Sequence, residues 1–237
     1  LGGIGALVDA AAAYVTERGC VLRTERAAST VAPDGSGWRV GDARFDAVVF
    51  ASPAAATARL LGDAAPDAAR GLGAVKYADV IMVRLAIPGG AWPERLAGLS
   101  GYLVPKGEQR TVTAASFASQ KWAHWRPADG SQIVRISMGR DGLPVDQLDD
   151  TDALQRAVDE FGTHIGADVQ PHATSITRWT AAFPQYRPHH FEHVAAVERD
   201  LPAGLYLAGA SYRGIGIPAC VADGQRAAAA VVAHLRP

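Results

Sequence analysis

The sequence from Gly204 to Arg226 reads Gly-Leu-Tyr-Leu-Ala-Gly-Ala-Ser-Tyr-Arg-Gly-Ile-Gly-Ile-Pro-Ala-Cys-Val-Ala-Asp-Gly-Gln-Arg, and no other stretch is more informative about the fold. The apolar run at 205–208 predicts a buried strand. The glycines at 209–216, here called the glycine loop, predict backbone that takes positive φ or approaches a ligand closely. Pro218 favours the first turn of a following helix. The N–H groups and partial positive charge of that helix start would suit an electron-rich ring that forms an anion.

The glycine loop also carries a family resemblance. Gly209-Ala-Ser-Tyr, Gly214-Ile-Gly216-Ile-Pro218, Cys220 and Gly224 resemble the carboxyl-terminal flavin loop of the protoporphyrinogen and coproporphyrinogen oxidases of haem synthesis. Three further segments resemble the same family in the same order: Leu1-Gly2-Gly3, Ser119-Gln120-Lys121-Trp122, and Trp179 followed by Phe183-Pro184-Gln185-Tyr186 and His189.

The resemblance implies a fold of mixed α/β and α+β class, as in the two-domain oxidoreductases of the flavin amine oxidase superfamily. Residues 1–73 and 184–237 would belong to a domain that binds FAD, and residues 74–183 would form a substrate domain with a mixed sheet. Such enzymes open with a strand, Gly-x-Gly-x-x-Gly and a helix that bind the ADP half of FAD. The 237 residues hold no such motif, because Gly2-Gly3-Ile4-Gly5 has the wrong spacing. We therefore expect the carboxyl-terminal part of a longer enzyme, whose missing amino-terminal segment completes the cofactor site.

Composition narrows the function classes. The chain has 49% hydrophobic and 20% charged residues and a net charge of −1, so it can bury a core and shows no charge suited to nucleic acid. No apolar run reaches the roughly 20 residues that a membrane span needs. Two distant cysteines, Cys20 and Cys220, imply no disulfide framework and fit a reducing compartment. We expect a cytoplasmic protein, with peripheral attachment to a membrane as an alternative.

Periodicity and turn residues predict the remaining elements. Helices are expected at 4–18, from Pro53 after a Ser52 cap, and at 150–165 after an Asp150-Thr151 cap. Strands are expected at 21–24, 29–31, 38–40, 45–50, 80–87, 102–104, 111–118, 132–138 and 175–179.

Cofactor contacts are expected where the resemblance meets the glycine loop. Backbone N–H groups at Ile215, Gly216 and Ile217 would stabilise charge on a reduced flavin, and Gly209 would let the backbone approach it. The resemblance places Trp179 against the flavin, although a core tryptophan at a strand end is the alternative. It also places Ala28 near the adenine side of FAD, although an ordinary strand alanine fits equally.

Substrate contacts are expected at two cations. Lys121 lies beside Trp122, near His124 and Trp125, and a cation among aromatics suits a tetrapyrrole with an apolar rim and carboxylates. The alternative is that Lys121 is a solvated loop lysine. Arg213 is expected to contact the substrate with the same alternative. The histidines of the His189-His-Phe-Glu-His193 segment lack a third ligand, so no metal site is predicted.

The reaction implied by the resemblance is the six-electron oxidation of a porphyrinogen, with dioxygen or another acceptor reoxidising the flavin. No side chain has to act as an acid or base, so no catalytic residue is predicted. A near-neutral chain without a membrane span favours coproporphyrinogen III over protoporphyrinogen IX. Another amine oxidase or desaturase of the superfamily, or a non-catalytic fragment, remains the alternative.

Overall fold

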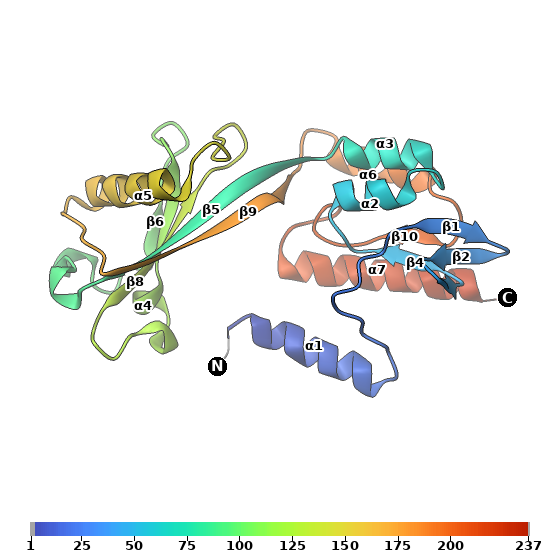
Figure 1. Ribbon diagram of the computed structural model, residues 1–237, viewed down its shortest axis with the longest axis horizontal. Helices are drawn as coiled ribbons and strands as arrows, with labels where there is room; N and C mark the ends of the chain where they lie inside the picture. The colour runs from blue at the N-terminus through green and yellow to red at the C-terminus, as the bar shows by residue number, and fades with distance from the viewer. Residues whose placement is uncertain (1–2, 237) are drawn as a thin grey trace.

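A computed structural model describes residues 3–236, so Leu1 and Gly2 of the predicted Gly-Gly segment lie outside the described residues. The chain forms two bodies, each with its own hydrophobic core, joined by two long strands (Figure 1). The fold is mixed α/β, as the sequence predicts. No helix among residues 3–236 is long and apolar enough to cross a membrane.

One body, here called the sheet body, is a five-stranded antiparallel sheet in the order β6-β7-β8-β5-β9. Its strands are β5 (Lys76–Ile87), β6 (Gly101–Leu103), β7 (Val112–Phe117), β8 (Gln132–Met138) and β9 (Ala173–Gln185). Short helices fill the connections: η1 (Gly89–Ala91), η2 (Glu94–Leu96), α4 (Ala118–Lys121) and η3 (Ala123–Trp125).

Helix α5 (Asp150–Ile165) covers one face of this sheet (Figure 1). Alternate residues of β5, namely Ile81, Val83 and Leu85, are buried against the apolar stripe of α5, which includes Ala157 and Phe161. Strand alternation therefore turns Met82 and Arg84 to the opposite face. The cap of α5 is Asp149, whose carboxylate accepts from the Asp152 backbone at 2.8 Å, one residue before the predicted Asp150-Thr151.

The second body, here called the loop body, holds two small sheets and four α-helices. Its elements are β1 (Val31–Asp34), β2 (Gly37–Val40), β3 (Ala43–Phe45), β4 (Val48–Phe50), α2 (Ala54–Leu61), α3 (Pro66–Gly73), α6 (His190–Arg199), β10 (Leu205–Leu207) and α7 (Ile217–Leu235). Helix α1 (Gly5–Glu17) precedes this body and has no buried residue. Strands β1, β2 and β3 form an antiparallel meander, and β10 pairs with β4 in parallel.

Four local predictions are wrong. Of the strand predicted at 29–31 only Val31 lies in a strand, because β1 runs from Val31 to Asp34. The run at 45–50 is not one strand, because Phe45 ends a strand paired with β2 while Val48 begins a strand paired with β10. Residues 21–24 form no strand and lie exposed. The Ser52 hydroxyl does not cap α2; it hydrogen-bonds the Thr57 hydroxyl at 2.8 Å, and the helix begins after Pro53.

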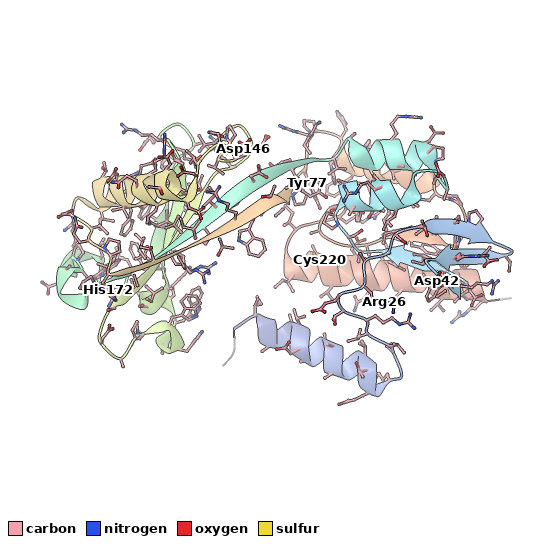
Figure 2. The ribbon with its side chains drawn as sticks, in the orientation of Figure 1. Arg26, Asp42, Tyr77, Asp146, His172 and Cys220 are labelled. Atoms are coloured by element: carbon pink, nitrogen blue, oxygen red, sulfur yellow. The ribbon has the colours of Figure 1, made fainter. Side chains whose placement is uncertain are left out.

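Strands β5 and β9 carry the chain out of the loop body and back. They pair from Lys76↔Gln185 to Ala86↔Ala173, with one register shift between Ala78 and Val80, and form a ribbon between the two cores (Figure 1). The start of β5 is fixed by Tyr77, whose hydroxyl lies 2.7 Å from the Ser211 hydroxyl and accepts the Ala54 N–H at 2.8 Å (Figure 2). The division at residues 74 and 183 stays a prediction, and β9 runs on through residue 183.

Candidate functional site

The glycine loop leads into the amino-terminal end of α7, as the sequence predicts. Gly216 is the N-cap residue and Pro218 lies in the first turn. Figure 1 shows this end of the 19-residue helix directed toward the sheet body, with Cys220 in its first turns (Figure 2). Within residues 3–236, the backbone N–H groups of Ile215, Gly216 and Ile217 donate no hydrogen bond. These donors are therefore available to an acceptor over the loop.

The backbone requires glycine at two positions of the loop but not at the third. Gly209 and Gly214 take φ of +114° and +133°, which other residues rarely adopt. A Cβ at Gly214 would lie 2.5 Å from the Ala219 Cβ, so glycine is required there. Gly216 has φ −69°, and a Cβ there would meet only the Pro218 ring at 3.9 Å. The fold of these residues does not require glycine at 216, and close approach by a flavin there stays a prediction.

Tyr186 braces the glycine loop. Its hydroxyl donates to the Ala210 carbonyl at 2.7 Å and accepts the Gly214 N–H at 2.7 Å, so it spans the loop. The ring stacks on His190 with centroids 3.9 Å apart, and His190 Nε2 donates to the Tyr212 carbonyl at 3.1 Å. Burial raises the pKa of the Tyr186 phenol and lowers the pKa of the His190 imidazole. Both side chains are therefore neutral parts of the loop support.

A network of four charged side chains anchors the loop to α6 and α7. Asp223, whose side chain is 2% exposed, accepts the Gly209 N–H at 2.9 Å and pairs with Arg226 Nε at 2.8 Å. Arg213 forms an ion pair with Glu198 and lies 3.6 Å from Asp223. Arg226 also donates to the Leu207 carbonyl at 2.7 Å. The structure thus gives the Arg213 guanidinium internal partners, and a substrate contact by this residue stays a prediction.

The hydrogen-bond donors and the apolar side chains at the glycine loop suit a flavin ring. Three free backbone donors at a helix start, held by Tyr186 and by the Asp223 network, place a partial positive charge at a fixed position. The side chains of Ile215 and Ile217 beside it are 38% and 44% exposed, so apolar surface flanks the donors. A flat aromatic ring whose edge becomes anionic matches both features.

The sheet face opposite α5 carries the predicted residues Trp179 and Lys121, and we call it the open face. Trp179 lies on it, because Trp179 pairs with Val80 while the neighbouring pair, Arg178 and Ile81, faces α5. Arg178 confirms this orientation through its ion pair with Asp150 of α5 at 2.7 Å. Trp179 is 54% exposed, so it is not the core tryptophan of the alternative interpretation. Its contact with a flavin stays a prediction.

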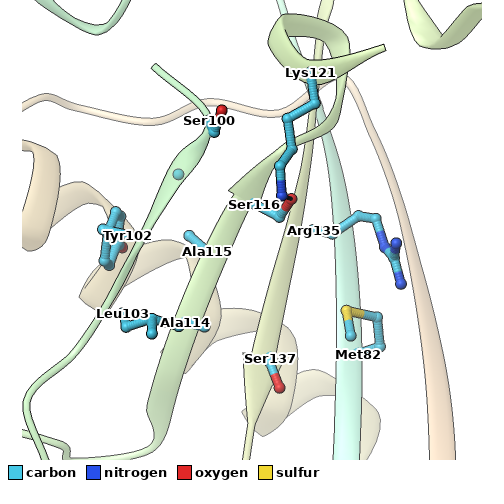
Figure 3. Close-up of a pocket in the computed structure, with 11 residues that line it drawn as sticks. Met82, Ser100, Tyr102, Leu103, Ala114, Ala115, Ser116, Lys121, Arg135 and Ser137 are labelled. Atoms are coloured by element: carbon cyan, nitrogen blue, oxygen red, sulfur yellow. Dashed lines mark hydrogen bonds between the residues drawn. The ribbon is translucent and has the colours of Figure 1, made fainter. Parts of the chain in front are cut away.

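Lys121 reaches the same face from α4. Its ammonium lies 3.4 Å from the Ser116 hydroxyl and 5.1 Å from the centre of the Trp122 ring. Together with Arg135 it lines a cavity of about 430 Å³ in the sheet body (Figure 3). The other lining residues are Met82, Ser100, Gly101, Tyr102, Leu103, Ala114, Ala115, Ser116 and Ser137. Lys121 is thus at the edge of a concave surface.

The remaining sequence-predicted residues lie elsewhere. Ala28 is exposed in the irregular segment before β1, where it lines a separate surface cavity together with Arg26 and Asp42 (Figure 2). It is not a strand residue, and its contact with the adenine side stays a prediction. His193 donates from Nε2 to the Gly71 carbonyl at 2.8 Å. Within residues 3–236 no group of three or more metal-ligating side chains gathers.

Sequence reasoning gave no role to Tyr186, Asp223, Arg226, Arg84 or Arg135. The Asp-x-x-Arg spacing at 223–226 is a usable signal, because residues three apart on a helix are neighbours. Tyr186 belongs to the Pro-Gln-Tyr motif, but the sequence alone did not indicate what its side chain does. Arg84 and Arg135 carried no signal, since only the register of the sheet brings them together.

Comparison with known proteins identifies the family of this chain. The family described as Flavin containing amine oxidoreductase matches residues 1–232. Coproporphyrinogen III oxidase of Mycobacterium tuberculosis (strain ATCC 25618 / H37Rv) is 35% identical over 221 residues, which cover 92% of this chain and 44% of that protein. Protoporphyrinogen oxidase of Homo sapiens is 28% identical over 98% of this chain and 50% of its own length. The chain thus spans about half the length of these relatives.

Solved structures share the fold. A structure from Exiguobacterium sp. 255-15, provisionally named protoporphyrinogen oxidase, superposes with a TM-score of 0.71 at 21% identity, over 88% of this chain and 46% of that one. Cyclohexylamine oxidase from Brevibacterium oxydans IH-35A gives a TM-score of 0.64 at 18% identity, over 88% of this chain and 48% of that one. At these identities the likeness concerns the fold alone. With the match over residues 1–232, the chain belongs to the flavin containing amine oxidoreductase family.

Proposed function

We propose that the chain is the carboxyl-terminal part of an FAD-dependent porphyrinogen oxidase, which oxidises coproporphyrinogen III, or alternatively protoporphyrinogen IX, to the porphyrin. Dioxygen is the proposed acceptor. The proposal is supported by the names of the relatives and by the sequence of the glycine loop. The observation that carries it is the set of unpartnered N–H groups at Ile215, Gly216 and Ile217 on the loop that resembles the family's flavin loop.

The chemistry divides between cofactor and protein. A bound flavin supplies hydride acceptance, and Ile215, Gly216 and Ile217 would hold its ring edge through their N–H groups. Oxidising a porphyrinogen removes three hydrides from bridging carbons and three protons from the macrocycle, and three dioxygen molecules take up these electrons and protons as hydrogen peroxide. No buried acid or base is needed for this balance. The chain's own task is to orient the macrocycle and to stabilise negative charge at the loop.

The remaining partners are also part of the proposal. The amino-terminal segment of the same enzyme would supply the dinucleotide-binding strand, turn and helix that residues 1–237 lack. A cytoplasmic location fits the composition, and peripheral membrane attachment is the alternative.

The second candidate is an amine oxidase of the same family, since cyclohexylamine oxidase shares the fold. The Gly-Ile-Gly-Ile-Pro sequence at 214–218 favours the porphyrinogen oxidases, because amine oxidases of the superfamily normally end in a Gly-Trp-x-x-Gly-Ala type of loop. An amine is also a poor match for a cavity lined by Lys121 and Arg135 and by no acidic residue.

The experiment is a turnover assay on the chain joined to its complete upstream sequence. The purified protein is expected to be yellow, and coproporphyrinogen III in air is expected to yield fluorescent coproporphyrin with hydrogen peroxide. Protoporphyrinogen IX and cyclohexylamine serve as the competing substrates. Amine oxidation without porphyrin formation would establish the second candidate, and a colourless protein without flavin would overturn both.

A further inference from the structure

Two arginines face each other across adjacent strands of the open face. Arg84 of β5 is directly opposite Arg135 of β8 in the antiparallel register. Residues in such a pair have Cβ atoms about 4.5–5.5 Å apart, and like charges placed there destabilise a sheet. A protein gains no stability from this arrangement, so another reason for it is required.

Within residues 3–236, no carboxylate offsets this charge. Arg84 donates only to the Thr177 hydroxyl, at 2.9 Å, and Arg135 has no side-chain hydrogen bond, with its guanidinium 5.9 Å from the centre of the Trp125 ring. Neither arginine forms an ion pair, nor does Lys121. Three cations on one face are thus left without a negative partner.

The position of these cations divides the open face into two ends. Trp179, Val80 and Met82 form an apolar end toward the loop body, and Arg84 follows Val80 by four residues along β5. At about 3.3 Å per residue this places the arginine pair roughly 13 Å farther from the loop body than the tryptophan. Lys121 and Arg135 continue the cationic end into the cavity (Figure 3).

We propose that Arg84 and Arg135 together bind carboxylate groups of the macrocyclic substrate, with Lys121 as an accessory cation. An apolar ring would lie over Trp179, Val80 and Met82, and its acidic side chains would extend to the arginines. Arginine suits this role, because its planar guanidinium donates to a carboxylate through two parallel bonds. The assignment makes the pair substrate-positioning residues, and it rests on the proposed porphyrinogen oxidase function.

The test measures binding of coproporphyrin III, the oxidised product, to the full-length flavoenzyme by fluorescence titration. The tetramethyl ester of the same porphyrin is the uncharged comparison. Wild-type enzyme is expected to prefer the acid. Arg84→Gln and Arg135→Gln are each expected to weaken acid binding by about tenfold or more and to leave ester binding unchanged. Arg135→Lys is expected to recover part of the loss.

Two controls separate positioning from structure. Arg156→Gln removes the same charge from the exposed surface of α5, on the other side of the sheet, and is expected to bind both ligands as wild type does. Thermal unfolding of Arg84→Gln is expected at or above the wild-type temperature, because a like-charge pair is relieved. A lower unfolding temperature with equal loss of acid and ester binding would mean a structural role and overturn the inference.

Turnover of coproporphyrinogen III in the same samples separates this inference from the proposed function. Active wild-type enzyme whose arginine variants bind the acid normally would overturn the inference alone. Wild-type enzyme that neither binds coproporphyrin nor forms it would overturn both.

Discussion

The Tyr186 hydroxyl accepts the backbone N–H of Gly214 at 2.7 Å, across the loop that leads into α7. The same hydroxyl donates to the carbonyl of Ala210 at 2.7 Å. One side chain from the end of the β9 segment therefore fixes the loop whose free donors would meet a flavin. This contact gives the Pro-Gln-Tyr motif a physical role that its sequence alone did not reveal.

Tyr186→Phe is expected to lower the free energy of unfolding by about 1–3 kcal/mol, because the Gly214 N–H and Ala210 carbonyl lose their partner. Urea unfolding followed by circular dichroism measures the change. Tyr206→Phe is the matched control, since the Tyr206 hydroxyl has no hydrogen bond within residues 3–236. Equal stability of Tyr186→Phe and wild type would mean that water replaces the hydroxyl at no cost.

Gly216→Val is expected to reduce flavin binding in the full-length enzyme by at least about tenfold and to preserve the fold. Its φ of −69° suits any residue and a Cβ finds open space, so the valine would occupy only the volume a ligand needs. Flavin content after gel filtration, beside circular dichroism, measures both effects. Gly224→Ala, an exposed position of α7 with open space around it, is the control. Full flavin occupancy in the valine variant would mean that the loop does not contact the flavin.

Residues 1–237 alone are expected to bind no stoichiometric FAD, because the strand, turn and helix that hold the pyrophosphate are absent from this sequence. Purification of the 237-residue chain with added FAD, followed by an absorbance spectrum, tests this. A yellow sample with close to one flavin per chain would show that the glycine loop and its surroundings suffice.

Lys121→Ala is expected to raise KM for the porphyrinogen and to lower kcat/KM by about tenfold, with flavin content unchanged. A partly desolvated charge contact is worth roughly 1.5–3 kcal/mol, and about 1.4 kcal/mol corresponds to a decade in rate. Lys121→Arg is expected to recover part of the loss. Lys106→Ala, at an exposed lysine of the sheet body, is the control. Steady-state kinetics identical to wild type would mean that Lys121 is solvated and does not contact the substrate.

Unfolding of the protein is expected to depend on His190 in mildly acidic solution. Burial holds the pKa of His190 in the folded protein below its unfolded value of about 6.5, so between these two values the unfolded chain binds more protons. Stability from this group is complete above about pH 6.5 and is lost as the pH falls toward the folded pKa. The neighbouring His193 lowers the pKa of His190 in the same direction as burial.

Urea midpoints measured from pH 8 to pH 5 test this dependence. His190→Gln is expected to flatten the decline below pH 6.5, while His234→Gln, at an exposed position near the end of α7, is expected to leave it unchanged. Parallel curves for His190→Gln and wild type would assign the decline to other groups.

Local sequence patterns predicted much of this architecture. Strand β8 begins and ends at the predicted residues, and α7 begins one residue before Pro218, since strand alternation and a helix-start proline are local signals. The prediction of a single strand at 45–50 was wrong because its two halves pair with different strands, β2 and β10. Strand pairing depends on the three-dimensional fold and not on local sequence. The arginine pair of the open face was invisible for the same reason. Register, not spacing, places Arg84 opposite Arg135.

The ribbon of β5 and β9 has a consequence for the order of folding. Pairing Lys76 with Gln185 closes a loop that contains the whole sheet body, and the pairing of β10 with β4 closes a still longer one. Contacts between residues so far apart in the chain form slowly, because a long loop must be closed first. The glycine loop follows β10 and needs Tyr186, the residue directly after β9. The region proposed to hold the flavin is therefore expected to be among the last parts to assemble, after the sheet that would hold the substrate.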